Sequence, residues 1–214
     1  MEKKSGEICQ VILKKARELP FLHRHPWVFS GAIARIHGKP GDGDAVAVVT
    51  HDGQFVGRGL FNEKSNIRVR LYAFHEKASL NDEFWKTKIE RAVFLRKELL
   101  NLTGDSAACR LVNSEGDGLS GLTVDRYGAW LVVQFTALGL FLRKEIILAS
   151  LRGAVQPKGI ILRTEKGMRE TEGIKTTDHL AMGAAPSESF RVSENGLTFK
   201  TDLMAGQKTG FYLD

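Results

Sequence analysis

Cysteine, proline and long apolar runs are scarce in this sequence. The two cysteines, Cys9 and Cys109, lie far apart and outside any Cys-x-x-Cys pattern, which excludes a disulfide scaffold and a zinc ribbon. The longest apolar stretch, residues 131–142, is interrupted by polar residues and is too short to span a bilayer. No apolar segment follows the charged N-terminus. We therefore expect a reduced, cytoplasmic protein with no membrane association.

The composition is that of a folded protein, and its positive charge is concentrated in the first third. Hydrophobic residues make up 43% and charged residues 26%, which excludes a disordered or fibrous chain. Of the net charge of +6, residues 1–80 hold most, with 13 Lys and Arg against 8 Asp and Glu. Such clustering is typical of a protein that binds a polyanion such as nucleic acid. A solvated basic surface is the alternative.

Residues 7–77 carry the signals of a small, basic, mostly β domain. The Asp52-Gly53 pair predicts a hairpin turn between two strands. In a further strand over residues 67–74, apolar residues alternate with Arg68 and Arg70, so both arginines are expected on the face opposite the apolar side chains.

A second group of basic and aromatic residues lies near the start of this domain. Arg24 and His25 come just before Trp27 and Phe29 in the chain, and Pro26 suits the first position of a helix. Aromatic rings beside cations could stack on exposed bases while the cations hold phosphate. Phe29 is expected in the core, whereas for Trp27 a core position and a stacking position both remain open.

Residues 78–188 predict a central α/β domain in the order strand, strand, helix, strand, strand. A helix from Ser79 comes before these elements within the domain. The strands over 119–127 and 129–136 are joined by a turn at Gly128. Apolar residues at helical spacing predict a helix over 138–151 that stops at Gly153, and a strand follows over 159–164. Residues 189–214 begin with a β-hairpin turned at Asn195-Gly196. The fold class predicted is α+β.

For three features of the sequence, we favour a structural interpretation over a functional one. Gly116–Gly121 matches G-x-G-x-x-G, but β-prone residues follow it, so we expect a loop between strands rather than a nucleotide site. Glu115, Asp117 and Asp125 could form a metal site, but no histidine is near and turn formation is the simpler explanation of Asp117. We expect no metal and no catalytic residue, with both cysteines as unreactive thiols.

The sequence resembles the N-terminal part of the bacterial large-subunit ribosomal RNA (cytosine-5)-methyltransferases that begin with a PUA domain. Four stretches carry the resemblance in the family's order: residues 25–31, residues 57–62 with 67–70, residues 110–128, and residues 194–196 with 206–214. The last two are long and specific. One departure is Ser120, where the family usually has proline.

The resemblance implies an RNA-binding PUA-like pseudo-barrel, a central α/β domain and the beginning of a methyltransferase domain that binds S-adenosylmethionine. The implied role is to bind structured RNA, with large-subunit rRNA as the partner, and to position it for cytosine-5 methylation in rRNA processing. The expected RNA contacts are Lys14, Arg24, His25, Trp27, Arg58, Arg68 and Arg70.

The resemblance also implies where the cofactor would bind. Residues that match the family's cofactor-bordering segment are Gln207, Lys208, Thr209 and Phe211. In the family, the catalytic core and its cysteine follow the position of Asp214. We therefore expect a truncated chain that is inactive by itself and has no cofactor, S-adenosylmethionine belonging to the intact parent.

A protein-interaction or dimerisation module of the same parent is the alternative function. The apolar helix over 138–151 and the hairpin from Phe190 would then pack against a second copy. A self-contained metal-dependent hydrolase using Asp117 and Asp125 is a minor third reading.

Overall fold

The computed structural model describes residues 8–102, 108–186, 190–194 and 197–203. The chain divides into two compact units. Unit 1 runs to Asn81 and also includes residues 171–173, which the chain reaches much later. Unit 2 comprises residues 82–170 and the residues from Ile174 onward.

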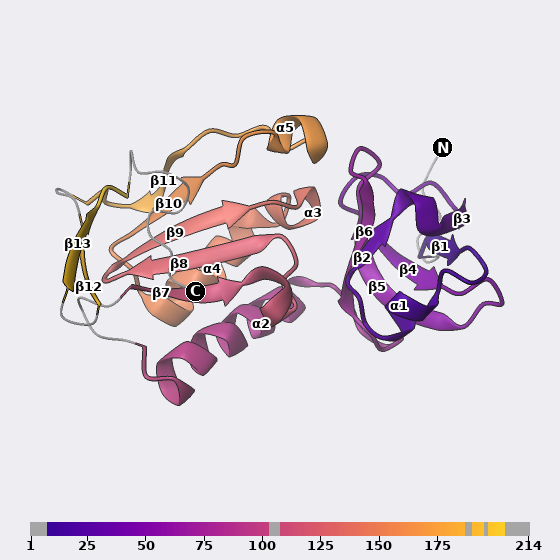
Figure 1. The fold of residues 1–214 in the computed structure, drawn as a ribbon, viewed down its shortest axis with the longest axis horizontal. Helices are drawn as coiled ribbons and strands as arrows, with labels where there is room; N and C mark the ends of the chain where they lie inside the picture. Colours follow the sequence, from indigo (N-terminus) through magenta and orange to yellow (C-terminus); the bar gives the residue numbers. More distant parts are fainter. Residues whose placement is uncertain (1–7, 103–107, 187–189, 195–196, 204–214) are drawn as a thin grey trace. The chain divides into compact units, whose positions relative to one another are not determined.

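Unit 1 is built almost entirely of short strands (Figure 1). Its elements are β1 (Gln10–Leu13), α1 (Leu19–Leu22), β2 (Trp27–Phe29), the 3-10 helix η1 (Ser30–Ala32), β3 (Ile33–His37), β4 (Ala45–Val49), β5 (Phe55–Phe61) and β6 (Ile67–Ala73). The strands form one six-stranded sheet in the order β2-β6-β5-β4-β1-β3. All neighbouring pairs are antiparallel except β1 with β4, which is parallel.

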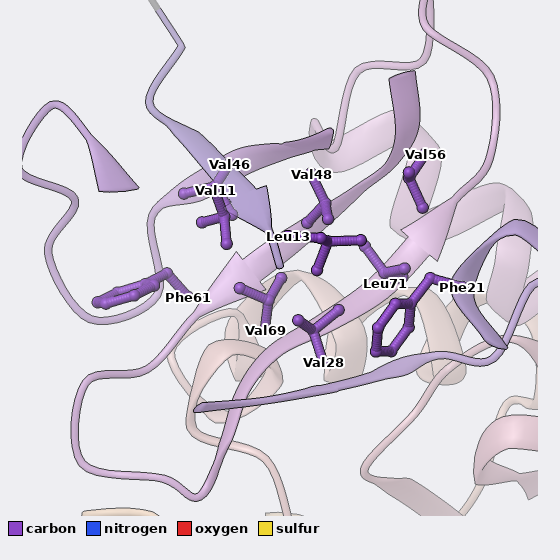
Figure 2. Packing of buried hydrophobic residues seen from close by; sticks show 10 residues of the cluster. All are labelled: Val11, Leu13, Phe21, Val28, Val46, Val48, Val56, Phe61, Val69 and Leu71. Carbon is purple, nitrogen blue, oxygen red and sulfur yellow. The ribbon is translucent and has the colours of Figure 1, made fainter. Parts of the chain in front are cut away.

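The sheet of unit 1 curls around a core of valine, leucine and phenylalanine side chains (Figure 2). The core residues are Val11, Leu13, Phe21, Val28, Val46, Val48, Val56, Phe61, Val69 and Leu71. They come from five strands and from α1; in β1, β4 and β6 they are alternate residues, which point to the same side of the strand. The hairpin predicted at Asp52-Gly53 is confirmed, since β4 and β5 pair in antiparallel register across it.

Proline does not begin a helix where the sequence suggested it. Pro26 directly precedes the strand β2, and the first turn of α1 instead holds Pro20. Proline disfavours helical dihedral angles for the residue before it, and both the first turn of a helix and the start of a strand accommodate its missing N–H. The expectation for Pro26 is therefore wrong, and the consequence is an extended segment that carries Trp27 and Phe29.

Unit 2 contains a five-stranded sheet with helices and a separate hairpin (Figure 1). Its elements are α2 (Asp82–Phe94), the π-helical turn η2 (Leu95–Leu99), β7 (Ala108–Asn113), the 3-10 helix η3 (Ser114–Asp117), β8 (Leu122–Tyr127), β9 (Trp130–Phe135), α3 (Leu138–Phe141), α4 (Lys144–Val155), β10 (Gly159–Arg163), α5 (Met168–Thr171, ending at the boundary with unit 1), β11 (His179–Gly183), β12 (Phe190–Glu194) and β13 (Leu197–Thr201). The sheet order is β11-β10-β9-β8-β7. Only β9 and β10 are parallel, joined through α3 and α4.

The predicted helix over residues 138–151 is two helices, and Gly153 does not end the second. The helical run is interrupted at Leu142 and Arg143, and α4 continues through Gly153 to Val155. The helix ends instead at Gln156, which adopts a left-handed conformation with φ of 53° and is followed by Pro157. Because proline restricts the residue before it, Pro157 rather than the glycine decides the boundary.

Both surfaces suggested for a second copy are used inside unit 2. Leu140, Ile147 and Leu151 of the helices are buried within unit 2, where α4 packs against α2. Val192 of the hairpin, together with Leu203, packs against Tyr127, Val132 and Ile161 of the sheet. The hairpin predicted from Phe190 is confirmed as β12 paired with β13, while its turn at residues 195–196 lies outside the described residues. The inward-facing apolar residues of both elements are therefore occupied within unit 2, while Leu142 and Phe199 remain 55% and 36% exposed.

Candidate nucleic-acid interface

The edge strand β2 of unit 1 presents two aromatic side chains away from the core. Val28 is fully buried among the core valines, so its neighbours Trp27 and Phe29 point to the other side of the strand. Phe29 is 40% exposed and Trp27 is half-buried. The expectation that Phe29 fills the core is wrong, because Val28 already occupies the inward position of this three-residue strand.

These aromatic rings form a row of edge-to-face contacts. The ring centroids of His25 and Trp27 are 5.9 Å apart, and those of Trp27 and Phe29 are 6.4 Å apart, with the planes nearly perpendicular in both pairs. The backbone N–H of Trp27 donates to Nδ1 of His25 at 3.2 Å, which orients the imidazole. A row of partly exposed rings held in this way suits stacking with nucleobases.

Cations surround this aromatic row. The exposed Arg24 guanidinium lies 6.0 Å from the ring centroid of Phe74. Arg68 is half-buried and follows Ile67, the register partner of Phe29. The exposed Lys14 donates from Nζ to the carbonyl oxygen of Gly31 at 2.9 Å, two residues beyond Phe29. Three of the predicted cations thus lie along the β2–β6 edge, where a phosphate backbone could follow them.

Arg58 lies on β5, the strand next to β6. In the β5–β6 register it stands opposite Ala73, one residue before the Phe74 ring that Arg24 overlies. Its Nε and Nη2 donate to the carbonyl oxygen of Glu76 at 3.1 and 2.8 Å. These bonds go to a neutral carbonyl, so the guanidinium keeps its full positive charge.

Arg70 is on the predicted face of β6 but is not exposed there. Its residue exposure is only 9%, and Nη2 lies 3.3 Å from Oε1 of Glu172. Its guanidinium is 5.8 Å from the ring centroid of Trp27, its register partner on β2. The alternation of the sequence correctly gave the face of Arg70, but it could not show that residues 171–173 cover that face. Arg70 therefore contacts Trp27 and does not offer a surface charge.

Glu172 is the residue of this region that the sequence did not indicate. It is 5% exposed, belongs to unit 1, and is separated from Arg70 by 102 positions in the chain. No motif or periodicity marks it in the sequence. The exposed position of Phe29, in contrast, follows from its alternation with Val28 once that residue is placed in the core.

The glycine motif of unit 2 is a loop between strands, as expected. It runs from β7 through η3 into β8, and Gly118 and Gly121 have φ of 64° and 90°. A Cβ atom at Gly121 would lie 2.3 Å from Cβ of Ala137. No helix follows the loop, so it has no helix N-terminus with which to hold a pyrophosphate. The glycines serve the tight path of the backbone.

The acidic residues near this loop do not converge on a common point. Asp117 pairs with Arg96 at 2.6 Å, and the fully buried Asp125 pairs with Arg110 at 2.9 Å. Glu115 accepts a hydrogen bond from Ser120 at 2.7 Å. Within the part of the chain that the structure describes, no group of three or more His, Cys, Asp or Glu side chains could hold a metal ion. Each of the three carboxylates therefore has an ion-pair or hydrogen-bond partner of its own.

Cys109 and Lys88 have shifted pKa values whose cause is burial. Burial raises the pKa of the Cys109 thiol, whose Sγ donates to the carbonyl oxygen of Leu102 at 3.4 Å, so the group is a poor nucleophile. Burial, followed by the neighbouring Arg91, lowers the pKa of Lys88. The Lys88 Nζ lies 5.6 Å from the ring centroid of Phe84 and 2.6 Å from the position that a Cβ atom at Gly118 would take.

The comparisons with known proteins agree with a PUA-like first part. The sequence model of the PUA-like domain family matches residues 11–74. Ribosomal RNA large subunit methyltransferase I of Escherichia coli O157:H7 is 34% identical over 205 residues, which are 96% of this chain and 52% of that protein. The same enzyme of Aeromonas salmonicida is 36% identical over 204 residues, covering 95% of this chain and 51% of the relative. The chain spans about half the length of the curated relatives it matches.

Two solved structures share the fold. A candidate SAM-dependent methyltransferase from Streptococcus mutans has a TM-score of 0.78 at 20% identity, covering 97% of this chain and 52% of the other. A second candidate methyltransferase, complexed with SAH, has the same TM-score and identity. The match covers 97% of this chain and 51% of that chain. The mixed α and β architecture is thereby confirmed.

The expectation that this chain has no cofactor and lacks a catalytic core is not upheld. Relatives named as methyltransferases align with 95–96% of the chain, and the structure complexed with SAH covers 97% of it. The predicted cofactor contacts Gln207, Lys208, Thr209 and Phe211 lie outside the described residues. Among the described helices, none is long and apolar enough to cross a membrane.

Proposed function

We propose that this chain is the RNA-recruiting part of an S-adenosylmethionine-dependent ribosomal RNA methyltransferase, and that unit 1 binds the RNA. The observation that carries the proposal is the β2–β6 edge, where Trp27 and Phe29 face outward between Arg24, Arg68 and Lys14. Phosphate contacts by the cations would position the RNA, and stacking on the rings would favour unpaired bases over a regular duplex.

The finer parts of the proposal come from the relatives. Their names specify large-subunit rRNA, and we carry this substrate over to the present chain. The similarity noted in the sequence adds cytosine C5 as the methylated atom and Gln207, Lys208, Thr209 and Phe211 as cofactor contacts. In such an enzyme S-adenosylmethionine supplies the methyl group. The described residues of unit 1 bind and orient the RNA.

Reversing one charge on the proposed surface tests the RNA interface. Arg68→Glu should weaken binding to a structured large-subunit rRNA fragment with an unpaired loop, and should reduce the steepness of the log affinity against log salt plot by about 0.7 per lost phosphate contact. Arg152→Glu is the matched control, because Arg152 is an exposed arginine of unit 2. Fluorescence anisotropy at several salt concentrations measures both variants.

The outcome of this experiment discriminates between specific placement and general charge. If both reversals weaken binding equally, the interface is not on the β2–β6 edge and only the net charge of the chain matters. If neither substitution changes the affinity for RNA, and the affinity does not depend on salt concentration, the chain does not recruit RNA through phosphate contacts.

Self-association is the second candidate function, with a different surface from the one first considered. Phe94, Leu99 and Leu100, at the end of α2 and in the turn after it, are 54%, 66% and 54% exposed. Large apolar side chains exposed close together in the chain are candidates for a contact surface. Sedimentation at several concentrations should show a dimer that Leu99→Glu dissociates, and a strict monomer would exclude this function.

A further inference from the structure

Glu172 lies at the centre of a buried polar cluster in unit 1. Its Oε1 accepts hydrogen bonds from the Ser65 hydroxyl at 2.6 Å and from Nη2 of Arg70 at 3.3 Å. The Asn62 amide donates to Oε2 at 3.0 Å and to the backbone carbonyl of Glu172 at 2.9 Å. All four residues are less than 10% exposed. A buried carboxylate with this many donors is held in one orientation, since each alternative would leave a buried charge or donor unsatisfied.

The cluster reaches Trp27 through Arg70. The Arg70 guanidinium approaches the Trp27 ring to 5.8 Å, in the geometry of a cation–π contact. Glu172 fixes the other side of the same guanidinium. Without the carboxylate, the buried guanidinium would lose this ion pair and would no longer be held in place against the indole.

The cluster also reaches Phe29 and Arg68, through the loop of residues 62–66. Ser65 Oγ, which donates to Glu172, accepts from the backbone N–H of Ile67 at 3.1 Å. In the same loop, the carbonyl oxygen of Asn66 accepts from the backbone N–H of Ser30 at 3.0 Å, and its side chain accepts from the Ser30 hydroxyl at 3.1 Å. Ser30 follows Phe29, and Ile67 precedes Arg68. One carboxylate is therefore linked to both Trp27 and Phe29 of the aromatic row.

We propose that Glu172 is a positioning residue for RNA binding: from a distant part of the chain it fixes Arg70 and the 62–66 loop so that Trp27 and Phe29 are presented for stacking with bases. This inference rests on the proposed function of the β2–β6 edge. In this proposal Glu172 does not contact RNA. Arg70, paired with Glu172, holds Trp27 and does not bind phosphate.

The substitution Glu172→Gln in the full chain tests the proposal, because glutamine has nearly the same shape and lacks the charge. The indole N–H signal of Trp27 in a nitrogen–proton correlation spectrum should shift, while those of Trp85 and Trp130, which belong to unit 2, should stay. Affinity for a loop-containing RNA should fall by about fivefold or more, the range that loss of one stacked base produces. The salt dependence should be unchanged, since no phosphate contact is lost.

Asp125→Asn is the matched control, because Asp125 is a buried carboxylate paired with an arginine in unit 2. It should leave the Trp27 signal and the RNA affinity as they are. Should Glu172→Gln fail to fold, the double variant Arg70→Met, Glu172→Leu removes both charges together, which buried pairs usually tolerate. It should fold and still bind RNA about fivefold or more weakly than the wild type.

Two results would overturn the proposal. An unmoved Trp27 signal with unchanged affinity would show that Glu172 does not position the row. Tighter binding with a salt dependence steeper by about 0.7 would show instead that Glu172 masks Arg70 from phosphate. If the wild-type chain binds no RNA, the proposed function fails, whereas the Trp27 signal still reports whether Glu172 holds the ring.

Discussion

At Gly121 the backbone comes so close to Ala137 that only glycine fits. The residue has φ of 90°, and an added Cβ atom would lie 2.3 Å from Cβ and 3.0 Å from the backbone nitrogen of Ala137. Its carbonyl oxygen accepts from the N–H of Thr136 at 2.8 Å, so the contact cannot open without losing a hydrogen bond. The glycine of the third motif position is thus explained by packing of the loop on the residue before α3.

Gly121→Ala should destabilise unit 2 more than dihedral strain alone explains. Gly53→Ala is the control, because Gly53 has nearly the same φ, 92°, with nothing within 4 Å of its added Cβ. We expect Gly53→Ala to lower the free energy of unfolding by about 1 kcal/mol and Gly121→Ala by about 1–3 kcal/mol more. Chemical denaturation measures both, and equal losses would contradict the steric explanation.

Individual residues of the interface differ in how far the sequence could predict them. Arg24, His25 and Trp27 are neighbours in the chain, so their proximity follows from the sequence directly. The environment of Arg70 does not, because its partner Glu172 comes from 102 positions away and alternation gives only the face of a strand. Whether a face is covered depends on which other segment packs on it, and local periodicity carries no information about that.

At the scale of elements, α1 is joined to the β4–β5 turn through the carboxylate of Glu18. Oε1 of Glu18, the residue that precedes α1, lies 2.6 Å from Nδ1 of His51. Burial would raise the pKa of Glu18, but hydrogen bonds from backbone N–H groups and from His51 outweigh it, so the pKa lies below its ordinary value of 4.5. The ionised carboxylate therefore stabilises the folded state.

The stabilisation by Glu18 should depend on pH in a defined direction. Because the folded pKa is lowered, its contribution is present in full above pH 4.5 and is lost as the pH falls through the folded value. The difference in free energy of unfolding between wild type and Glu18→Gln should therefore shrink as the pH falls from about 4.5 to about 3. Urea denaturation across this range measures it, and a difference independent of pH would contradict the assignment.

Elements with strong local signals were predicted well, and elements decided by their neighbours were not. The hairpin at Asp52-Gly53, the turn at Gly128 and the pair β12–β13 follow from turn chemistry and alternation. The sequence patterns do not predict the strand β7, although residues 110–128 carry part of the family resemblance. The division of the 138–151 segment at Leu142 and Arg143 was also missed, because apolar residues at helical spacing continue across the break.

At the scale of the whole molecule, each unit has a core of its own. Leu13 is fully buried in the core of unit 1, and Leu131 is fully buried in unit 2. Separate cores give the two units the means to unfold as separate cooperative transitions. The order of strands in each sheet, such as the parallel pairing of β1 with β4, was beyond sequence reasoning because pairing partners are set by the assembled core.

A matched pair of core substitutions tests this division. Leu13→Ala and Leu131→Ala each remove the same buried side chain and should each cost about 2–5 kcal/mol. Calorimetry should show two transitions, with Leu13→Ala lowering the midpoint of one and Leu131→Ala lowering the midpoint of the other. A single transition that both variants shift equally would mean that the cores do not unfold independently.

The most direct measurement of the central claim is ultraviolet crosslinking of the chain to a loop-containing rRNA fragment, followed by mass spectrometry of the crosslinked peptides. We predict crosslinks at Trp27 and Phe29, together with the neighbouring residues of the β2–β6 edge, because those rings would contact the bases. Crosslinks confined to residues 82–170, with none in β2 or β6, would contradict the account.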